Sequence, residues 1–242
     1  LEGCQATATV DVTIAPLPTA NAGADQSLCT QGASTAFTVT GTPSAGAVGT
    51  WSVVSGTATI ASPTSLSSEV SVSSANATLR FTAETPEGCQ ATDDVVLTVN
   101  PLPNVSLAPL SAVCENVSPF SLSGGSPANG TYSGPGVVNG VFNPATAGVG
   151  THTITYTFTN GNGCTNTASQ TITVKPQPVV SVASNTGSFE VCLGENLTLT
   201  ASGATTYRWE PASGLSATTG ASVTVNPTAT TTYTVYGTTN GC

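Results

Sequence analysis

Cysteine is the residue type in this chain best suited to chemistry, and there are seven of them in 242 residues. Successive cysteines are 25 to 60 positions apart, with no CxxC pair and no histidine close by, so metal ligation fits poorly. In a chain of which only 6% is charged, such cysteines indicate disulfides formed in an oxidising compartment. We therefore predict disulfide cysteines and no metal site. The seven are Cys4, Cys29, Cys89, Cys114, Cys164, Cys192 and Cys242.

Other groups with catalytic potential are sparse. His152 is the single histidine and stands at the start of an alternating strand pattern, which favours a plain strand residue over a general base. Asp93 and Asp94 are adjacent, so on a strand their carboxylates point to opposite faces and do not converge on calcium. No cleft-forming insertion supports the paired carboxylates of a retaining glycosidase. We predict no enzyme, no catalytic residue and no cofactor, and the ligand stays unknown.

Composition narrows the class of protein. Three Lys and Arg residues and a net charge of −9 exclude nucleic acid as a natural partner. Low charge with abundant Ser, Thr, Gly and Pro is also typical of disorder, but residues 151–158 alternate Thr with Ile, Tyr and Phe, which indicates half-buried strands. Apolar stretches are of strand length, so we expect no transmembrane segment. Neither an initiator Met nor a signal peptide is visible, and we expect an interior piece of a longer protein.

The strongest pattern is an internal repeat. Each copy begins with a Gly-Cys pair, followed by a strand that runs into Pro-x-Pro. A second cysteine, preceded by an apolar residue, comes after the Pro-x-Pro segment. Pro-x-Pro cannot continue a central strand and indicates a short, semi-rigid linker between domains. The predicted pieces are a last strand of an upstream domain at 1–15 and three domains at 16–100, 101–175 and 176–242, the third of them without its final strand.

Strand patterns in the third copy predict an all-β fold of tandem immunoglobulin-like sandwiches in a linear array. The expected strands are 179–183, 196–201, 206–210, 222–226 and 231–236.

Six aromatic residues recur at two strand positions in these copies and are expected in the cores. An aromatic surface that stacks sugars is the alternative interpretation. Trp51, Tyr132 and Trp209 are expected on the third strand of each sandwich, and Phe81, Tyr156 and Tyr233 on the sixth.

Residues 17–29, followed by Gly49-Thr50-Trp51 and Gly88-Cys89, resemble the PKD-like and immunoglobulin-like repeats of Bacteroidota surface proteins. Residues 192–203, 207–215 and 227–235 are similar to repeats of the giant adhesins of that phylum, including gliding-motility adhesins exported by type IX secretion. The resemblance implies a secreted, extracellular, cell-surface setting. The same modules also occur in secreted hydrolases. The second copy departs most, because it lacks Trp and is Gly-rich over 124–140.

Two disulfide schemes stay open. Pairing within each copy gives Cys29–Cys89, Cys114–Cys164 and Cys192–Cys242. Strand polarity opposes this scheme, because the two cysteines of one copy then lie at opposite ends of strands ~20 Å long, whereas a disulfide needs Cα atoms within ~7 Å. Stacking the domains head to tail gives Cys29–Cys164 and Cys114–Cys242 instead, as staples across the linkers.

The leading function is a structural or adhesive repeat of a large surface protein, forming a stalk or filament for adhesion or gliding motility. The alternative is a glycan-binding or spacer module of a secreted multidomain hydrolase. Expected partners are neighbouring repeats, with surface glycans or other cells as candidates. Residues 1–15 also resemble the strand that the third domain lacks, so end-to-end strand addition between chains is a further hypothesis.

Overall fold

The structure is a computed structural model that describes residues 3–30 and 32–242. About half of the chain is strand and 2% is helix. It divides into two compact units, the first comprising Leu1–Pro103 with Thr159–Thr165 and the second Asn104–Phe158 with Asn166–Cys242. Within the described residues, no helix has the length and apolar character needed to cross a membrane.

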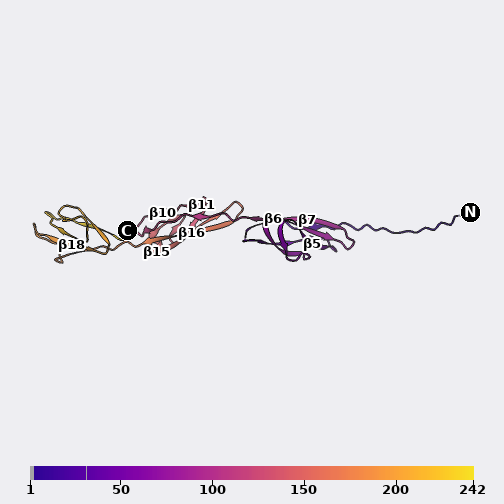
Figure 1. Cartoon of the computed structure of the whole chain (residues 1–242), viewed down its shortest axis with the longest axis horizontal. Coiled ribbons are helices and arrows are strands. Elements are labelled where there is room, and N and C mark those ends of the chain that lie inside the picture. The colour runs from indigo at the N-terminus through magenta and orange to yellow at the C-terminus, as the bar shows by residue number, and fades with distance from the viewer. Residues whose placement is uncertain (1–2, 31) are drawn as a thin grey trace. The chain divides into compact units, whose positions relative to one another are not determined.

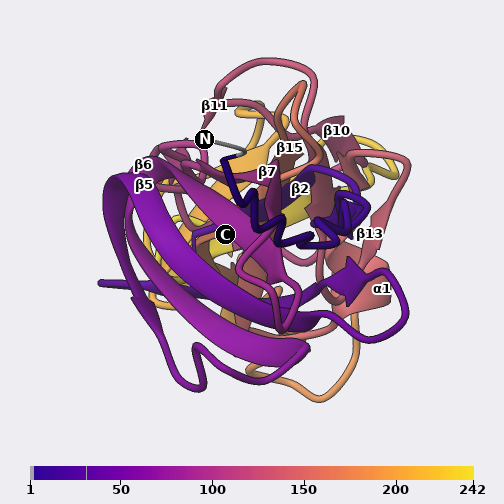
Figure 2. The same cartoon turned by 90° about the vertical axis from the view of Figure 1, so that its right-hand side faces the viewer.

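The first sandwich is organised around one long hairpin. β5 and β6 run side by side in antiparallel register (Figure 2). The first half of β6 pairs with β3 and its second half with β7, so the hairpin contributes to both layers. β2 pairs in parallel with the end of β7, and β1 pairs with β4. The strands are β1 (Ala20–Asn21), β2 (Gln26–Cys29), β3 (Thr35–Thr40), β4 (Thr42–Pro43), β5 (Val48–Ile60), β6 (Ser67–Glu84) and β7 (Gln90–Asn100).

The second sandwich has one well-formed sheet, in the order β12, β15, β16, β9, together with shorter pairings; Figure 1 labels β15 and β16. Its single helical turn, α1 (Pro144–Ala147), is capped by Asn143, whose side-chain oxygen accepts hydrogen bonds from the backbone N–H groups of Ala145 and Thr146. The strands are β8 (Ser106–Leu107), β9 (Val113–Cys114), β10 (Phe120–Ser121), β11 (Gly125–Ser126), β12 (Thr131–Ser133), β13 (Val137–Val138), β14 (Val141–Phe142), β15 (Gly150–Thr159) and β16 (Thr165–Lys175).

The third sandwich has a three-stranded sheet, β17-β18-β20, facing a two-stranded sheet, β19-β21. This is the A-B-E and C-F pairing of an immunoglobulin-like sandwich, without the final G strand beside β21. The strands are β17 (Ser181–Ser184), β18 (Leu197–Ser202), β19 (Thr206–Glu210), β20 (Ser222–Val225) and β21 (Thr234–Thr238).

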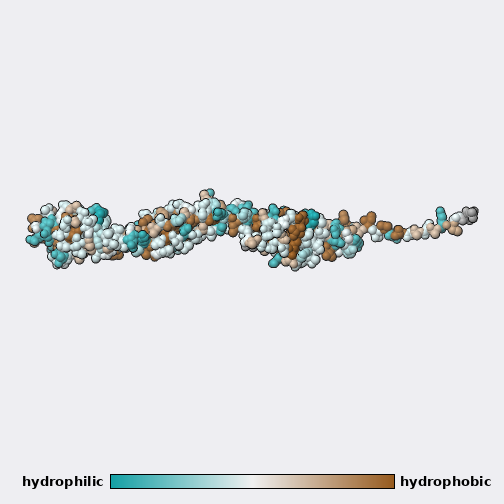
Figure 3. Space-filling model, viewed as in Figure 1, coloured by the Kyte–Doolittle hydropathy of each residue, from teal (hydrophilic) through white to brown (hydrophobic). Residues whose placement is uncertain are grey.

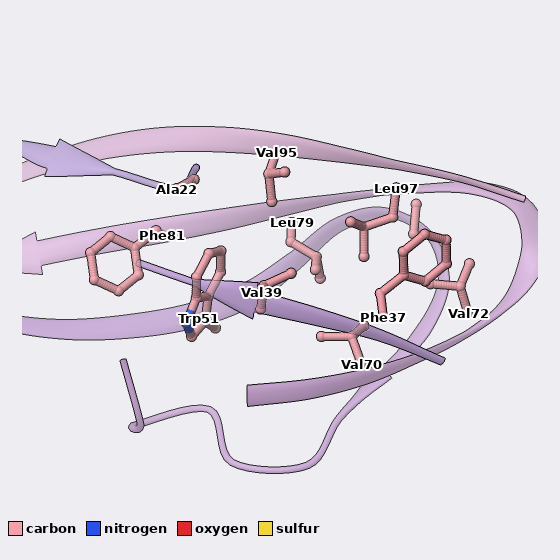
Figure 4. Close-up of a cluster of buried hydrophobic side chains, with 11 residues drawn as sticks. Ala22, Phe37, Val39, Trp51, Val70, Val72, Leu79, Phe81, Val95 and Leu97 are labelled. Carbon is pink, nitrogen blue, oxygen red and sulfur yellow. The ribbon is translucent and has the colours of Figure 1, made fainter. Parts of the chain in front are cut away.

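Each sandwich has its own hydrophobic cluster, and each cluster draws its residues from one of the three predicted ranges. In the first, Trp51 and Phe81 pack with ring centroids 4.9 Å apart (Figure 4). Gly41 and Gly49 make room for the Phe81 ring, because a Cβ at either position would lie within 2.3 Å of a ring carbon. Alternation with period two therefore produced buried faces, as expected for strands that cover a core.

Five of the six predicted aromatic residues lie on the paired strands where they were expected, and Tyr233 does not. Trp51 lies opposite Phe81, and Tyr132 opposite Tyr156, in paired strands. Trp209 lies opposite Val235, so Val235 takes the place that was predicted for Tyr233.

Tyr233 precedes β21, and its hydroxyl donates to the carbonyl of Ser213 at 2.8 Å. An alternating run with an aromatic residue predicts a strand, but the run carries no signal for the residue at which pairing begins.

The strand prediction for the third copy matches β19 and comes within one residue of β18 and β20 at each end, while β17 and β21 begin two and three residues later than expected. Residues 3–15 form no strand in this structure, and residues 1–2 lie outside the described part. Their role as a last strand stays a prediction.

Candidate functional site: disulfides beside the proline linkers

A tight turn presents one cysteine of each repeat. The glycine before Cys89, Cys164 and Cys242 has a positive φ between 77° and 84°, a conformation that glycine adopts without steric cost. In the second repeat, the side-chain oxygen of Asn160 accepts from the backbone N–H of Cys164 at 3.0 Å, and Asn160 N–H donates to the Cys164 carbonyl at 2.9 Å. In the first two repeats, the Gly-Cys motif is therefore the hairpin turn that joins the last two strands, β6 to β7 and β15 to β16.

A short parallel strand positions the other cysteine. Cys29 ends β2 opposite Asn100, the last residue of β7. Cys114 ends β9 opposite Lys175, the last residue of β16. Each cysteine thus lies at the C-terminal end of its sandwich, directly beside the Pro-x-Pro segment. Sequence reasoning gave the polarity but missed these strands, whose only signal is the apolar residue before each cysteine.

The structure contains the disulfides Cys29–Cys164 and Cys114–Cys242, with Cα–Cα distances of 5.5 and 5.6 Å. Both distances are normal for a disulfide. The head-to-tail scheme is therefore confirmed, and pairing within a repeat is wrong for these four cysteines. Each bond joins the final-strand end of one repeat to the hairpin turn of the next.

Polar contacts surround each disulfide. The Asn160 side-chain amide donates to the carbonyl of Pro101, in the first linker, at 3.2 Å. Lys175 donates from Nζ to the carbonyl of Asn240 at 2.9 Å. Cys164 is completely buried, so the first disulfide is shielded from solvent on that side. The turns are thus held by hydrogen bonds as well as by the covalent bond.

Three cysteines carry no disulfide in this structure, namely Cys4, Cys89 and Cys192. The expectation of seven disulfide cysteines is met for four. The reason is geometric: each bond links one repeat to the next, so three successive repeats can form only two such bonds. Cys89 occupies the same turn position as Cys164, and Cys192 follows an apolar residue as Cys29 and Cys114 do.

In the part of the chain that the structure describes, the histidine and the two adjacent aspartates make separate contacts. His152 contacts the Gly148 carbonyl through Nε2 at 2.8 Å. Asp93 accepts from the backbone N–H of Ala22 at 2.8 Å, whereas Asp94 binds Arg80 on the other face of β7. Among the described residues, no group of three metal-ligating side chains comes together.

The exposed Arg80–Asp94 pair changes the acidity of both partners. The hydrogen bond that Arg80 donates, together with its positive charge, holds the pKa of Asp94 below its ordinary value. The same hydrogen bond, together with the negative charge of Asp94, raises the pKa of Arg80. Because solvent surrounds the pair, it contributes little to stability.

Four of the six aromatic residues that were predicted for the cores are buried. Trp51, Phe81, Tyr156 and Trp209 are each at most 4% exposed. Trp209 donates from its indole nitrogen to the carbonyl of Gly220 at 3.0 Å, as a buried core tryptophan does. These residues therefore serve the cores and not a sugar-binding platform.

No protein-family model matches the chain, and no curated protein matches it. Solved structures that it resembles include the N-terminal eight Ig domains of Down syndrome cell adhesion molecule, at 13% identity and TM-score 0.32, covering 86% of this chain and 37% of that one. A Ca2+-stabilised adhesin of an Antarctic bacterium, which binds ice, is 14% identical with TM-score 0.36, covering 87% and 66%. The fibronectin(III)-like modules of Clostridium thermocellum CbhA are 16% identical with TM-score 0.31, covering 66% and 95%.

The chain thus spans just over a third of the first of these proteins and about two thirds of the second. Similarity at this level carries no functional argument. The fold rests on the chain's own strand pairing, in which β17, β18 and β20 face β19 and β21. By that pairing, the chain is an all-β protein built of immunoglobulin-like β-sandwiches.

Proposed function

We propose that this chain is a load-bearing repeat segment of a large extracellular bacterial surface protein. It acts as part of a stalk or filament for adhesion or gliding motility, exported by a Bacteroidota type IX route as the sequence resemblance implies. Its partners are neighbouring repeats of the same protein, and its three PKD-like sandwiches correspond to residues 16–100, 101–175 and 176–242.

The observation that carries this proposal is the interleaving of the two disulfides. Cys114 lies inside the loop closed by Cys29–Cys164, and Cys164 lies inside the loop closed by Cys114–Cys242. Three stretches of chain, 29–114, 114–164 and 164–242, therefore connect the same two covalent junctions. Extension of the chain between these junctions is therefore limited by the shortest stretch, 114–164.

Stable disulfides also support the location. They persist in oxidising surroundings such as the cell exterior. The bonded cysteines are separated by 135 and 128 positions, and closing loops of this size is worth about 4–5 kcal/mol each in the chain-entropy model. For sandwiches this small, which bury limited core, that contribution is large.

We expect antibodies against the segment to label intact cells of the source bacterium. We also expect cells whose parent protein carries Cys29→Ser and Cys114→Ser to detach at lower shear than wild-type cells, while adhering normally at rest. Thr30→Ser is the matched control, since it keeps the disulfides, and should leave the shear threshold unchanged.

Two results would contradict the proposal. One is a shear threshold that is identical with and without the disulfides. The other is a catalytic domain in the parent polypeptide whose substrate turnover, and not cell attachment, depends on this segment, which would assign it as a spacer or glycan-binding module of a secreted hydrolase.

A further inference from the structure

The outer face of the two-stranded sheet in the third sandwich holds an open hollow of about 550 Å³. β19 and β21 form its floor, and residues 219–221 border it along the other edge of β19. Thr219 pairs with Arg208 in an isolated bridge, and the backbone N–H of Gly220 donates to the carbonyl of Tyr207 at 3.2 Å. Three adjacent extended segments therefore support the hollow, and their pairing fixes where the side chains lie.

Strand register arranges the side chains of this hollow in two rows. Arg208 lies between Thr219 on one side and Tyr236 on the other, because it is paired with both. Thr206 lies opposite Thr238 and stands two positions before Arg208 on β19, so both rows project from the same face. This face therefore presents one aromatic ring, one guanidinium and three threonine hydroxyls to solvent.

The aromatic ring of this face is exposed and held in place. Tyr236 is 47% exposed, and the guanidinium of Arg208 lies 4.5 Å from the centre of its ring. The same guanidinium donates a hydrogen bond to the carboxylate of Glu210. A guanidinium carries several N–H donors, and Glu210 takes only part of them. Arg208 can therefore hold the tyrosine ring and still donate to a ligand beside it.

The groups in the hollow match a sugar. The C–H face of a pyranose packs on an aromatic ring, while its hydroxyls exchange hydrogen bonds with a guanidinium and with threonine hydroxyls. The volume of the hollow also lies in the range of small-molecule sites.

Charge favours a neutral sugar over an acidic one. Among the described residues that line the hollow, Arg208 carries the single positive charge, and Glu210 already binds it. The chain has a net charge of −9, which repels anions. Figure 3, in the same view as Figure 1, shows that the visible surface around β18 is largely pale, the colour of residues of intermediate hydropathy. On that side the sandwich exposes mainly uncharged surface.

From this geometry we infer that the hollow binds an uncharged sugar unit of a polysaccharide. Tyr236 packs against the sugar ring, and Arg208 donates to the sugar hydroxyls. Thr206, Thr219 and Thr238 supply further hydroxyls at the edges of the site. This goes beyond the proposed function, because a segment that carries tension needs no ligand of its own.

Titration of the whole oxidised, 15N-labelled chain with oligosaccharides tests this assignment by nuclear magnetic resonance. Cellohexaose, laminarihexaose, mannohexaose and chitohexaose are the neutral probes, and oligogalacturonate is their acidic counterpart. We expect at least one neutral probe to shift the amide resonances of β19, β21 and residues 219–221 in a saturable way. Oligogalacturonate should leave these resonances in place.

Substitutions on one strand separate stacking from a general effect on the fold. Tyr236→Ala should weaken binding of the neutral probe about tenfold, because the stacking contact is lost, whereas Tyr236→Phe should bind normally. Thr234→Ala is the matched control, since Thr234 lies opposite Glu210 on the same face but outside the hollow. It should bind like the unaltered chain. The amide spectrum of each variant shows whether the third sandwich is folded.

Three results would overturn the inference. One is the absence of saturable shifts with every neutral probe, and another is equal weakening by Tyr236→Ala and Thr234→Ala. The third is binding of oligogalacturonate alone, which would assign the hollow to an acidic ligand. These measurements use the chain in solution, so their outcome is independent of the shear threshold that tests the proposed function.

Discussion

When the oxidised chain is stretched from residue 3 to Cys242, we expect extension to stop at no more than roughly 270 Å. In the reduced chain, we expect it to continue to roughly 860 Å, because an extended residue spans up to about 3.6 Å. Single-molecule force spectroscopy, with and without reductant, measures both lengths.

The difference follows from the covalent path. Load passes from residue 3 to Cys29, crosses to Cys164, and must then reach the Cys114–Cys242 junction. The shortest connection is residues 114–164, about 50 residues, so slightly more than two thirds of the chain lies outside the path that becomes taut. The other two stretches share the same junctions and remain slack until the short one yields.

Single substitutions separate this arrangement from pairing within repeats. Cys29→Ser opens the first junction and should lengthen the oxidised chain to roughly 400 Å, since only the second bond remains. Cys192→Ser should leave its length unchanged, because Cys192 is unpaired. Pairing within repeats predicts instead that Cys192→Ser lengthens the chain by roughly 180 Å, and that result would contradict the account.

Replacing Trp209 with Ala should unfold the third sandwich while leaving the other two folded. The indole is 1% exposed, and removing a buried tryptophan costs about 3–5 kcal/mol. A sandwich of this size has a free energy of unfolding of only about 3–10 kcal/mol. Hydrogen exchange measured by segment should therefore show lost protection in β18, β19 and β21 but not in β6 or β15.

Tyr236→Ala is the matched control in the same sandwich. This tyrosine is 47% exposed, and its ring lies 4.5 Å from the Arg208 guanidinium. Losing that exposed contact costs about 0.5–1 kcal/mol, so protection should persist. Equal protection in the Trp209→Ala and Tyr236→Ala proteins would mean that the core does not depend on the tryptophan.

The local alternation of apolar and polar residues was enough to predict strands that have one buried and one exposed face. Residues 206–210 alternate Tyr and Trp with polar residues, and β19 has those bounds. Alternation does not say where pairing stops, and so Tyr233 was placed on a strand that begins one residue later. The parallel strands β2 and β9 are too short to carry a period and exist only because the end of the final strand lies beside them.

The disulfide pairing could be partly predicted from the sequence for a different reason. A disulfide needs its cysteines close in space, and strand polarity places the two cysteines of one repeat at opposite ends. That argument identified Cys29–Cys164 as a candidate but did not exclude Cys29–Cys89, because the short strand that ends at Cys29 was not predicted.

Digestion of the oxidised chain after glutamate, without reduction, tests the central claim most directly. The fragments 3–69, 88–115, 116–190 and 196–242 each carry at least one of the four bonded cysteines. The account predicts that mass spectrometry finds 3–69 joined to 116–190 through Cys29–Cys164, and 88–115 joined to 196–242 through Cys114–Cys242. Finding 88–115 joined to 116–190, the product of a Cys114–Cys164 bond, would contradict it.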